Sequence, residues 1–444
     1  MKKALTCFAL FISFYCLHAS GQTWNPVGAI CFSANGADYL SMAIGTNGIP
    51  YVAYEDEGNG SATVMKYNGS SWVDVGSVDF SPGGSNYISI AIDLTGTPYV
   101  VYQDGGVGFP RTSVMRYDGI SWVYVGTESF STADAYYTSI AIDSNNMPYV
   151  AYEDGGDSLK ATVMKYVGSS WVNLGSPGFS DSQATYTKIV IANSGTPYVV
   201  YSDYADSQKA TVKKFDGTNW VTVGNAGFSA GKAQFTTMAI DSSGTPYVAF
   251  MDFGNGQKAT VMKYDGANWT AVGSPGFSAG AVDFTSIVIG SGLPYVIYDD
   301  GSNGNKATVM KYNGSSWVTV GSAGFSDSTV AYTSIVMDSS GTPYVAYETG
   351  GFSRATVMKL DSTTGIQLLR KVNNIDIYPN PATTSLTISS PDPITQITIT
   401  NFLGQTVYSN QHNAKQVQVD VSSLPDGVYF VKVNGSEVKK FVKE

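Results

Sequence analysis

The sequence predicts an all-β protein: a seven-bladed β-propeller of four-stranded blades, closed by its N-terminal strand, followed by a small C-terminal β-sandwich. Three observations lead to this prediction. A unit of about 49 residues recurs seven times along the chain. Each unit divides into four short strand-like segments separated by turns rich in Gly, Pro, Asp and Asn. The composition, with 48 Gly, 30 Tyr and only 14% charged residues, suits short strands and tight turns rather than disorder or a coiled coil.

Two series of residues define the repeat. The tryptophans and the prolines of a Pro-Tyr-Val triplet recur at intervals of 48–50 residues, which is typical of propeller blades. The tryptophans are Trp24, Trp72, Trp122, Trp171, Trp220, Trp269 and Trp317. The prolines are Pro50, Pro98, Pro148, Pro197, Pro246, Pro294 and Pro343. We expect each Trp, and the Tyr of each triplet, to pack between neighbouring blades.

The copy that begins at Phe235 shows how one unit is built. Alternating apolar residues predict its four strands, and Gly-containing turns separate them. The expected strands are residues 235–240, 247–250, 258–264 and 269–272. Gly244 in the first turn and the Asp265-Gly266 pair in the last connection are turn chemistry, because Gly adopts positive φ without strain.

The two ends of the repeat array predict ring closure. The chain around Trp24 to Gly28 matches only the fourth strand of a unit, whereas the last copy lacks a Trp strand. The N-terminal strand is therefore expected to complete the last blade, which leaves the ring without a free edge. We predict a propeller over residues 22–361, sufficient in one chain, so that a monomer is expected.

The first 21 residues are predicted to be a secretory signal peptide. Lys2 and Lys3 precede an apolar stretch over residues 4–17 that is too short to span a bilayer, and small residues precede a mature start at Gln22. No other stretch is long enough for a membrane span. After residue 21 the chain keeps one cysteine, Cys31, and one histidine, His412, so neither an intrachain disulfide framework nor His-based chemistry is expected in the repeats. The net charge of −10 argues against nucleic-acid binding.

A different pattern follows an expected linker over residues 362–373. Alternating apolar residues between Gly and Pro turns predict six or seven strands in a β-sandwich over residues 374–444. This segment resembles the type A C-terminal sorting domain of the type IX (Por) secretion system of Bacteroidetes. The resemblance rests on Phe402, on the terminal Lys-Phe-Val-Lys, and on Tyr378, Pro379, Asn380, Pro381, Leu403, Gly404, Gly427 and Tyr429. It implies export through the type IX translocon, followed by release or by attachment to the outer-membrane surface.

Two residue series in the loops of one propeller face are candidate ligand contacts. Carboxylates beside exposed aromatic rings suit sugars, because rings stack on apolar sugar faces while hydroxyls donate to carboxylates. The acidic series is Asp56, Asp104, Asp154, Asp203, Asp252 and Asp300, with Thr349 in the seventh copy. The aromatic series is Phe80, Phe130, Phe179, Phe228, Phe277 and Phe325, with Phe32 at the equivalent position of the first copy. The alternative is structural: the aspartates cap strand ends and the phenylalanines fill gaps between blades.

The sequence thus predicts a secreted or cell-surface binding protein for glycans or other surface ligands. The repeats also resemble secreted lectin-like and tectonin-like propellers with a Trp-x-x-Val-Gly element. No cofactor is expected, with calcium left as an alternative: the loop from Asp252 to Gly256 hints at calcium binding but lacks the ligand pattern of a dedicated site. No enzymatic activity is expected, because the repetition nominates no unique pair of carboxylates. A non-sugar adhesin or scaffold, and a glycoside hydrolase, remain alternatives.

Overall fold

The computed structural model describes residues 22–106, 110–351, 353–362, 375–434 and 437–444. The expected signal peptide and nearly all of the expected linker lie outside these ranges. Contacts divide the chain into two compact units, residues 1–363 and 364–444, which we describe separately.

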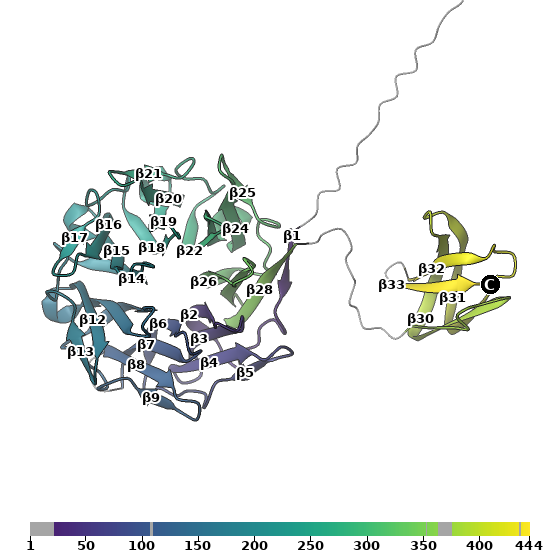
Figure 1. The fold of residues 1–444 in the computed structure, drawn as a ribbon, viewed down its shortest axis with the longest axis horizontal. Helices are drawn as coiled ribbons and strands as arrows, with labels where there is room; N and C mark the ends of the chain where they lie inside the picture. The colour runs from purple at the N-terminus through teal and green to yellow at the C-terminus, as the bar shows by residue number, and fades with distance from the viewer. Residues whose placement is uncertain (1–21, 107–109, 352, 363–374, 435–436) are drawn as a thin grey trace, which may run out of the picture. The chain divides into compact units, whose positions relative to one another are not determined.

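The first unit is a closed ring of seven four-stranded antiparallel sheets, as predicted (Figure 1). Within each sheet, the strands follow one another from the centre of the ring outward. Blades one to seven are, in order, β2 (Ala37–Ile44), β3 (Pro50–Asp56), β4 (Ser61–Tyr67), β5 (Trp72–Asp74); β6 (Ser85–Ile92), β7 (Pro98–Asp104), β8 (Arg111–Tyr117), β9 (Trp122–Tyr124); β10 (Ala135–Ile142), β11 (Pro148–Asp154), β12 (Lys160–Val167), β13 (Ser170–Asn173); β14 (Ala184–Ile191), β15 (Pro197–Asp203), β16 (Lys209–Phe215), β17 (Trp220–Thr222); β18 (Ala233–Ile240), β19 (Pro246–Asp252), β20 (Lys258–Tyr264), β21 (Trp269–Ala271); β22 (Val282–Gly290), β23 (Leu293–Asp300), β24 (Lys306–Tyr312), β25 (Trp317–Thr319); and β26 (Val330–Met337), β27 (Pro343–Thr349), β28 (Arg354–Ser362), β1 (Gln22–Pro26).

The N-terminal strand closes the ring, which confirms the prediction. β1 pairs antiparallel with β28, so that Trp24 lies opposite Leu360 in the last blade. Trp24 is buried and its indole Nε1 donates a hydrogen bond to the backbone oxygen of Val320 in the sixth blade, at 2.8 Å. A strand from one end of the chain therefore joins the sheet at the other end, and no blade carries an unpaired terminal strand.

The other six tryptophans make the same bond around the ring. Each indole donates to a backbone oxygen of the preceding blade, at 2.6–2.7 Å. Trp122, for example, donates to Val75 and Trp171 donates to Val125. The aromatic body of each Trp packs in the core between two blades while its only polar atom is satisfied. Blade-to-blade packing of the tryptophans is thus confirmed.

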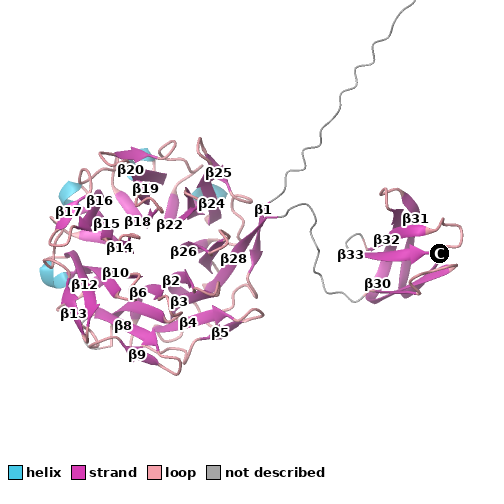
Figure 2. Ribbon diagram, in the orientation of Figure 1, coloured by secondary structure: helices cyan, strands magenta, loops and turns pink. Residues whose placement is uncertain are grey.

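Short 3₁₀ helices follow the second strand in four blades, at the rim of the ring (Figure 2). They are η1 (Gly155–Asp157), η2 (Tyr204–Asp206), η3 (Phe253–Asn255) and η4 (Gly301–Asn303). These helices lie in the loops between the second and third strands, of which β3–β4 is an example. The start of each innermost strand pairs with the end of the second strand, as Ala37 does with Asp56. These loops therefore share a propeller face with the connections between blades.

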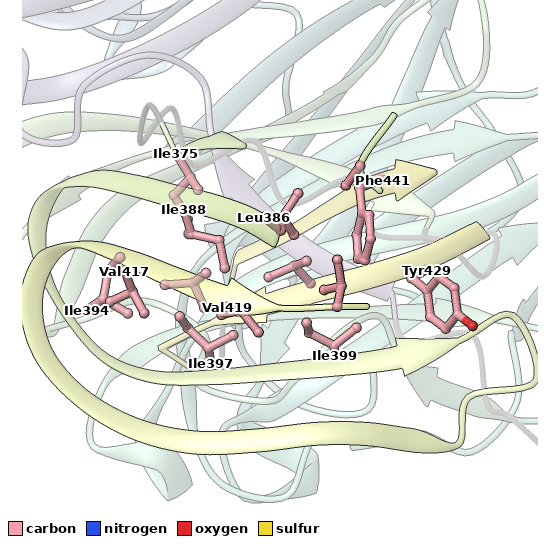
Figure 3. Packing of buried hydrophobic residues seen from close by; sticks show 14 residues of the cluster. Ile375, Leu386, Ile388, Ile394, Ile397, Ile399, Val417, Val419, Tyr429 and Phe441 are labelled. Atoms are coloured by element: carbon pink, nitrogen blue, oxygen red, sulfur yellow. The ribbon is translucent and has the colours of Figure 1, made fainter. Parts of the chain in front are cut away.

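The second unit is a small sheet folded over one apolar core (Figure 3). Its strands are β29 (Asp376–Tyr378), β30 (Ser385–Asn401), β31 (Thr406–Asp420), β32 (Gly427–Val433) and β33 (Glu437–Lys443). Five strands replace the six or seven expected, because β30 runs through two segments that the sequence pattern separates. One half of β30 pairs with β29 and the other half with β32, so the sheet encloses Leu386, Ile397 and Phe441.

Candidate binding site at the mouth of the central channel

The predicted acidic series is built into the loops of the fold. All six aspartates are buried, with 0–6% of their surface exposed. In each, one carboxylate oxygen accepts a hydrogen bond from the backbone N–H two residues later, as Asp154 Oδ1 does from Gly156 at 2.9 Å. Four of them are the N-caps of the 3₁₀ helices. Burial raises the pKa of Asp154 and Asp203.

Several second oxygens of this series also have partners. Asp104 Oδ2 accepts from Ser113 at 2.8 Å and Asp300 Oδ2 accepts from Thr308 at 2.8 Å. Asn255 donates its side-chain amide to Asp252 at 2.7 Å. These bonds use the oxygens that a sugar or an ion would need. Ligand contact by the six aspartates stays a prediction, and their placement favours the structural alternative.

The predicted phenylalanine series stacks on the tryptophans of the ring. Phe32 and the six other members each lie face to face with a Trp, with ring centroids 3.9–5.0 Å apart and planes 6–18° from parallel. The serine that follows each Phe is buried and accepts a backbone N–H of the third strand, as Ser81 does from Ala62 at 2.9 Å. We call these seven stacked Phe–Trp pairs the outer belt. One ring face of each Phe is occupied by protein, and ligand contact by the Phe series stays untested.

A second aromatic series lies at the centre of the ring. In every blade the innermost strand contains a β-bulge, where one extra residue shifts the register; in β2 it lies between Asp38 and Ser41. The bulged residue is aromatic each time and has a φ of 48–54°, in the left-handed region. We name these seven residues the aromatic collar: Tyr39, Tyr87, Tyr137, Tyr186, Phe235, Phe284 and Tyr332. Left-handed backbone costs roughly 1–2 kcal/mol for a residue with a side chain, so the fold accepts strain at this position seven times.

The collar forms a closed circle of rings. Neighbouring centroids are 4.9–5.2 Å apart, and neighbouring planes differ by 44–54°. If all seven ring planes were parallel to the propeller axis, neighbouring planes would differ by one seventh of a turn, about 51°. The observed angles are close to this value, so the planes stand nearly parallel to the axis. The collar surrounds a cavity of about 240 Å³ at the end of the channel that shares a face with the β3–β4 type of loop. Bulges commonly re-aim side chains next to functional sites.

Two residues further along each innermost strand lies a ring of hydroxyl groups that also lines the cavity. Most of these hydroxyl oxygens accept a backbone N–H of the next blade, as Ser41 does from Ile90 at 3.3 Å. The hydroxyl ring consists of Ser41, Ser89, Ser139, Thr237, Ser286 and Ser334. In the fourth blade the equivalent residue is Lys188.

Carboxyl groups gather beside the collar, one residue before a member of the aspartate series or, in the seventh blade, before Thr349. Burial, with the neighbouring carboxylates Asp38 and Glu57, raises the pKa of Glu55 to about 7. Burial also raises the pKa of Glu153 to about 7 and, with Asp283 and then Asp300, that of Asp299 to about 7.

The pKa of Glu348 is raised well above its usual range by burial and by the carboxyl group of Asp38. One carboxyl oxygen of Glu348, of Glu153 and of Asp299 is buried without a hydrogen-bond partner among the described residues. We call Glu55, Glu153, Asp299 and Glu348 the rim carboxyls. Their negative fields reach the collar: Glu55 and Asp38, for example, contribute to the raised pKa of Tyr39, after burial and Tyr87.

This site was not predicted. The Tyr or Phe at the collar position cannot be told from any other aromatic residue in a strand. The local sequence does not predict a bulge there, because positive φ is uncommon for residues other than glycine. One signal was available in the sequence: Lys188 occupies a position that is Ser or Thr in each of the other six units.

The sorting-motif residues lie in the second unit. Tyr429 is buried and its hydroxyl donates to the backbone oxygen of Pro425 at 2.8 Å. Asn380 accepts the N–H of Val442 at 2.9 Å, which ties the Tyr378–Pro381 segment to the last strand. Leu403 and Gly404 form an exposed turn after β30, where Asn401 accepts the N–H of Leu403 at 3.0 Å. The remaining motif residue, Gly427, begins β32.

The described ranges hold neither a cluster of metal ligands nor a helix suited to a membrane. They contain no group of three or more His, Cys, Asp or Glu side chains placed to hold a metal ion. None of the helices in those ranges has the length and apolar character needed to cross a membrane.

Comparison with known proteins supports the fold. A novel fungal alcohol oxidase of the AA5 family, in complex with copper, is 12% identical, with a TM-score of 0.51 over 96% of this chain and 99% of that one. The polysaccharide lyase Uly1 is 10% identical, with a TM-score of 0.50 over 74% and 90%. PorZ, a surface component of the type IX secretion system of Porphyromonas gingivalis, is 15% identical, with a TM-score of 0.48; this chain spans 60% of its length. At these identities the likeness concerns the fold alone.

Comparison by sequence identifies the second unit. No curated protein sequence matches the chain. Residues 376–444 match the family described as the secretion system C-terminal sorting domain, in agreement with the position of the sorting motifs. The C-terminal unit is therefore a type IX sorting domain, and the chain is a secreted, extracellular or surface-located cargo of that system that carries a seven-bladed propeller.

Proposed function

We propose that the propeller binds a saccharide at the mouth of its central channel and does not act as a catalyst. The aromatic collar is the observation that supports this most. Seven rings stand around one cavity at an energetic cost in backbone strain, and aromatic rings contribute apolar faces that match those of pyranose sugars. The five collar phenols have no hydrogen-bond partner among the described residues, so they are available to sugar hydroxyls.

The rim carboxyls complete this chemistry. A carboxyl with a pKa of about 7, such as that of Glu55 or Glu153, both accepts and donates hydrogen bonds near neutral pH. Groups of this kind satisfy hydroxyls in either orientation. The site is also single, at the axis, whereas the sequence led us to expect repeated sites in the outer loops.

One observation favours a second function, cleavage of a polysaccharide. Asp283 lies beside Asp299, and Asp38 beside Glu348, and in each pair burial and the neighbouring carboxylate raise a pKa. Pairs of carboxyl groups with separated pKa values are used for acid–base catalysis. Release of new reducing ends from a bound polysaccharide would identify such an activity.

The proposal is tested with the purified protein on a glycan array, with and without calcium. We expect reproducible binding to a related group of saccharides, independent of calcium, and loss of that binding in Tyr137→Ala. Binding that survives Tyr137→Ala but is lost in Asp154→Ala would place the site in the outer loops and contradict the proposal.

A further inference from the structure

Lys188 occupies one of seven equivalent positions and is the exception among them. The Ser or Thr of the other blades belongs to the hydroxyl ring, in which five of the six oxygens accept the N–H of the next blade, as Ser139 does from Ile189 at 3.2 Å. A lysine ammonium has no acceptor atom, so the corresponding bond to Met238 in the fifth blade is not formed. The junction between the fourth and fifth blades therefore lacks this contact at the place where the ring gains a positive charge.

The ammonium group of Lys188 is left without a protein partner. No hydrogen bond or ion pair is made by Lys188 Nζ within the described ranges. The side chain lines the cavity together with hydroxyl and aromatic groups, and desolvation lowers its pKa. A cation in such surroundings is destabilised unless an anion or a strong acceptor joins it. A ligand with an anionic group can supply the counter-charge that the protein does not provide.

The depth of Lys188 suits a carboxylate attached to a sugar ring. Lys188 follows the collar residue Tyr186 by two positions on β14, a distance of about 6–7 Å along a strand. A sugar ring held among the collar side chains would thus direct a substituent toward the ammonium. The cavity, about 240 Å³, is smaller than a typical site for drug-sized ligands, so it suits one sugar residue rather than a long segment.

The charge around the cavity is compatible with such a ligand. Besides Lys188, the groups that line it are neutral: hydroxyls, aliphatic side chains and aromatic rings. The rim carboxyls beside the collar include Glu55 and Glu153, whose pKa values of about 7 leave them half protonated near neutral pH. The four rim carboxyls, partly protonated, therefore repel an anionic ligand less than four ionised carboxylates would.

We propose that Lys188 binds the carboxylate of an acidic saccharide, a uronic acid, whose ring lies in the aromatic collar. This inference rests on the glycan-binding function proposed above and specifies its ligand class. The carboxylate accepts charge-assisted hydrogen bonds from the ammonium, in a cavity whose remaining polar groups are hydroxyls. One positive group on a seven-fold frame also gives the site a unique orientation.

Two variants of the full-length protein test the role of the charge. Lys188→Ser installs the residue that five other blades have at this position and restores an acceptor for Met238 N–H, so it is expected to fold. Lys188→Met keeps the length of the side chain and removes the charge. The binding of oligoglucuronate and of a neutral glucose oligosaccharide of equal length is measured by calorimetry. We expect either variant to bind oligoglucuronate about 10- to 100-fold more weakly than the parent, with unchanged binding of the neutral sugar.

A spectroscopic readout tests the contact independently of affinity. Reductive ¹³C-methylation makes the lysine amines visible by NMR, and the Lys188 signal is assigned by its absence in Lys188→Ser. We expect glucuronate to shift this signal and an equal concentration of glucose to leave it in place.

The outcomes separate the two proposals. Equal affinity for acidic and neutral sugars, or oligoglucuronate affinity that both variants retain, overturns the assignment of Lys188 and leaves glycan binding standing. Failure of every saccharide on the array and in the calorimeter overturns both.

Discussion

The outer belt and the central channel of the propeller follow opposite rules. In the belt, all seven units use the same Trp, the same stacked Phe and the same buried Ser. In the channel, two collar positions carry Phe instead of Tyr, and one position of the hydroxyl ring carries Lys188. A contact that holds blade to blade must be made at every junction of a closed ring, so its residues repeat without change. A position that faces the axis tolerates the loss of such a contact, as at Lys188, and its departures from the repeat indicate where function lies.

The largest expected effect comes from opening the belt at its closure. Deletion of residues 22–28 removes β1 and the bond from Trp24 to Val320, and it leaves β28 with an unpaired edge. Loss of one buried Trp alone costs about 3–5 kcal/mol, so we expect the melting temperature to fall by roughly 5–15 °C. Differential scanning calorimetry measures this fall. An unchanged melting temperature would contradict closure by the N-terminal strand.

A smaller effect is expected from the capping aspartates. Asp154→Ala removes the acceptor for Gly156 N–H at the start of η1, which costs about 1 kcal/mol and lowers the melting temperature by roughly 2–4 °C. Asp154→Asn keeps an acceptor oxygen and serves as the control, with a smaller change expected. Glycan affinity should be equal in both variants and the parent. A loss of glycan affinity without a fall in melting temperature would instead indicate that the aspartate series contacts the ligand.

The smallest effect concerns the pH dependence of the rim. The folded state raises the pKa of Glu55 and Glu153 from about 4.5 to about 7, so between these values the folded protein holds more protons than the unfolded chain. Stability should therefore fall as pH rises from about 4.5 to about 7, and the cost is fully present above that range. Glu348, whose pKa is also raised, contributes with the same sign.

Removal of one rim charge should weaken this dependence. We expect Glu348→Gln to raise the melting temperature at pH 8 by roughly 1–3 °C and to leave it nearly unchanged at pH 4.5. Melting curves recorded across this range provide the measurement. A variant that loses stability equally at both pH values would show that the carboxyl of Glu348 is held by a partner rather than destabilised by burial.

The sequence predicted the frame of this protein more completely than its site. Periodic Trp and Pro residues were enough for seven blades and for closure through Trp24, because the same contact is repeated and each copy confirms the others. The sorting domain was recognisable from motifs that lie at its turns and last strand, such as the segment from Tyr378 to Pro381. The division of each blade into four successive strands could be predicted from the Gly, Pro, Asp and Asn residues of the turns between them.

The candidate site depends on features that local sequence does not express. The collar arises from bulges with positive φ at aromatic residues such as Tyr137, and sequence alternation alone treats that residue as an ordinary strand position. Convergence of seven distant residues on one axis is a property of the closed ring. The raised pKa of Glu55 depends on burial beside Asp38, which the spacing of the two residues does not reveal.

The central claim is that ligand binding resides in the channel and stability in the belt. It is tested most directly by comparing Tyr137→Ala with Phe130→Ala, since both replace an aromatic residue in contact with the third blade: Tyr137 lies in the collar, and Phe130, in the connection before this blade, stacks on Trp171. Glycan affinity and melting temperature are measured for each, with the best-binding saccharide from the array. We expect Tyr137→Ala to weaken binding about 10-fold with little change in melting temperature, and Phe130→Ala to lower the melting temperature with affinity unchanged. The reverse pattern, with affinity lost in Phe130→Ala and kept in Tyr137→Ala, would contradict this account.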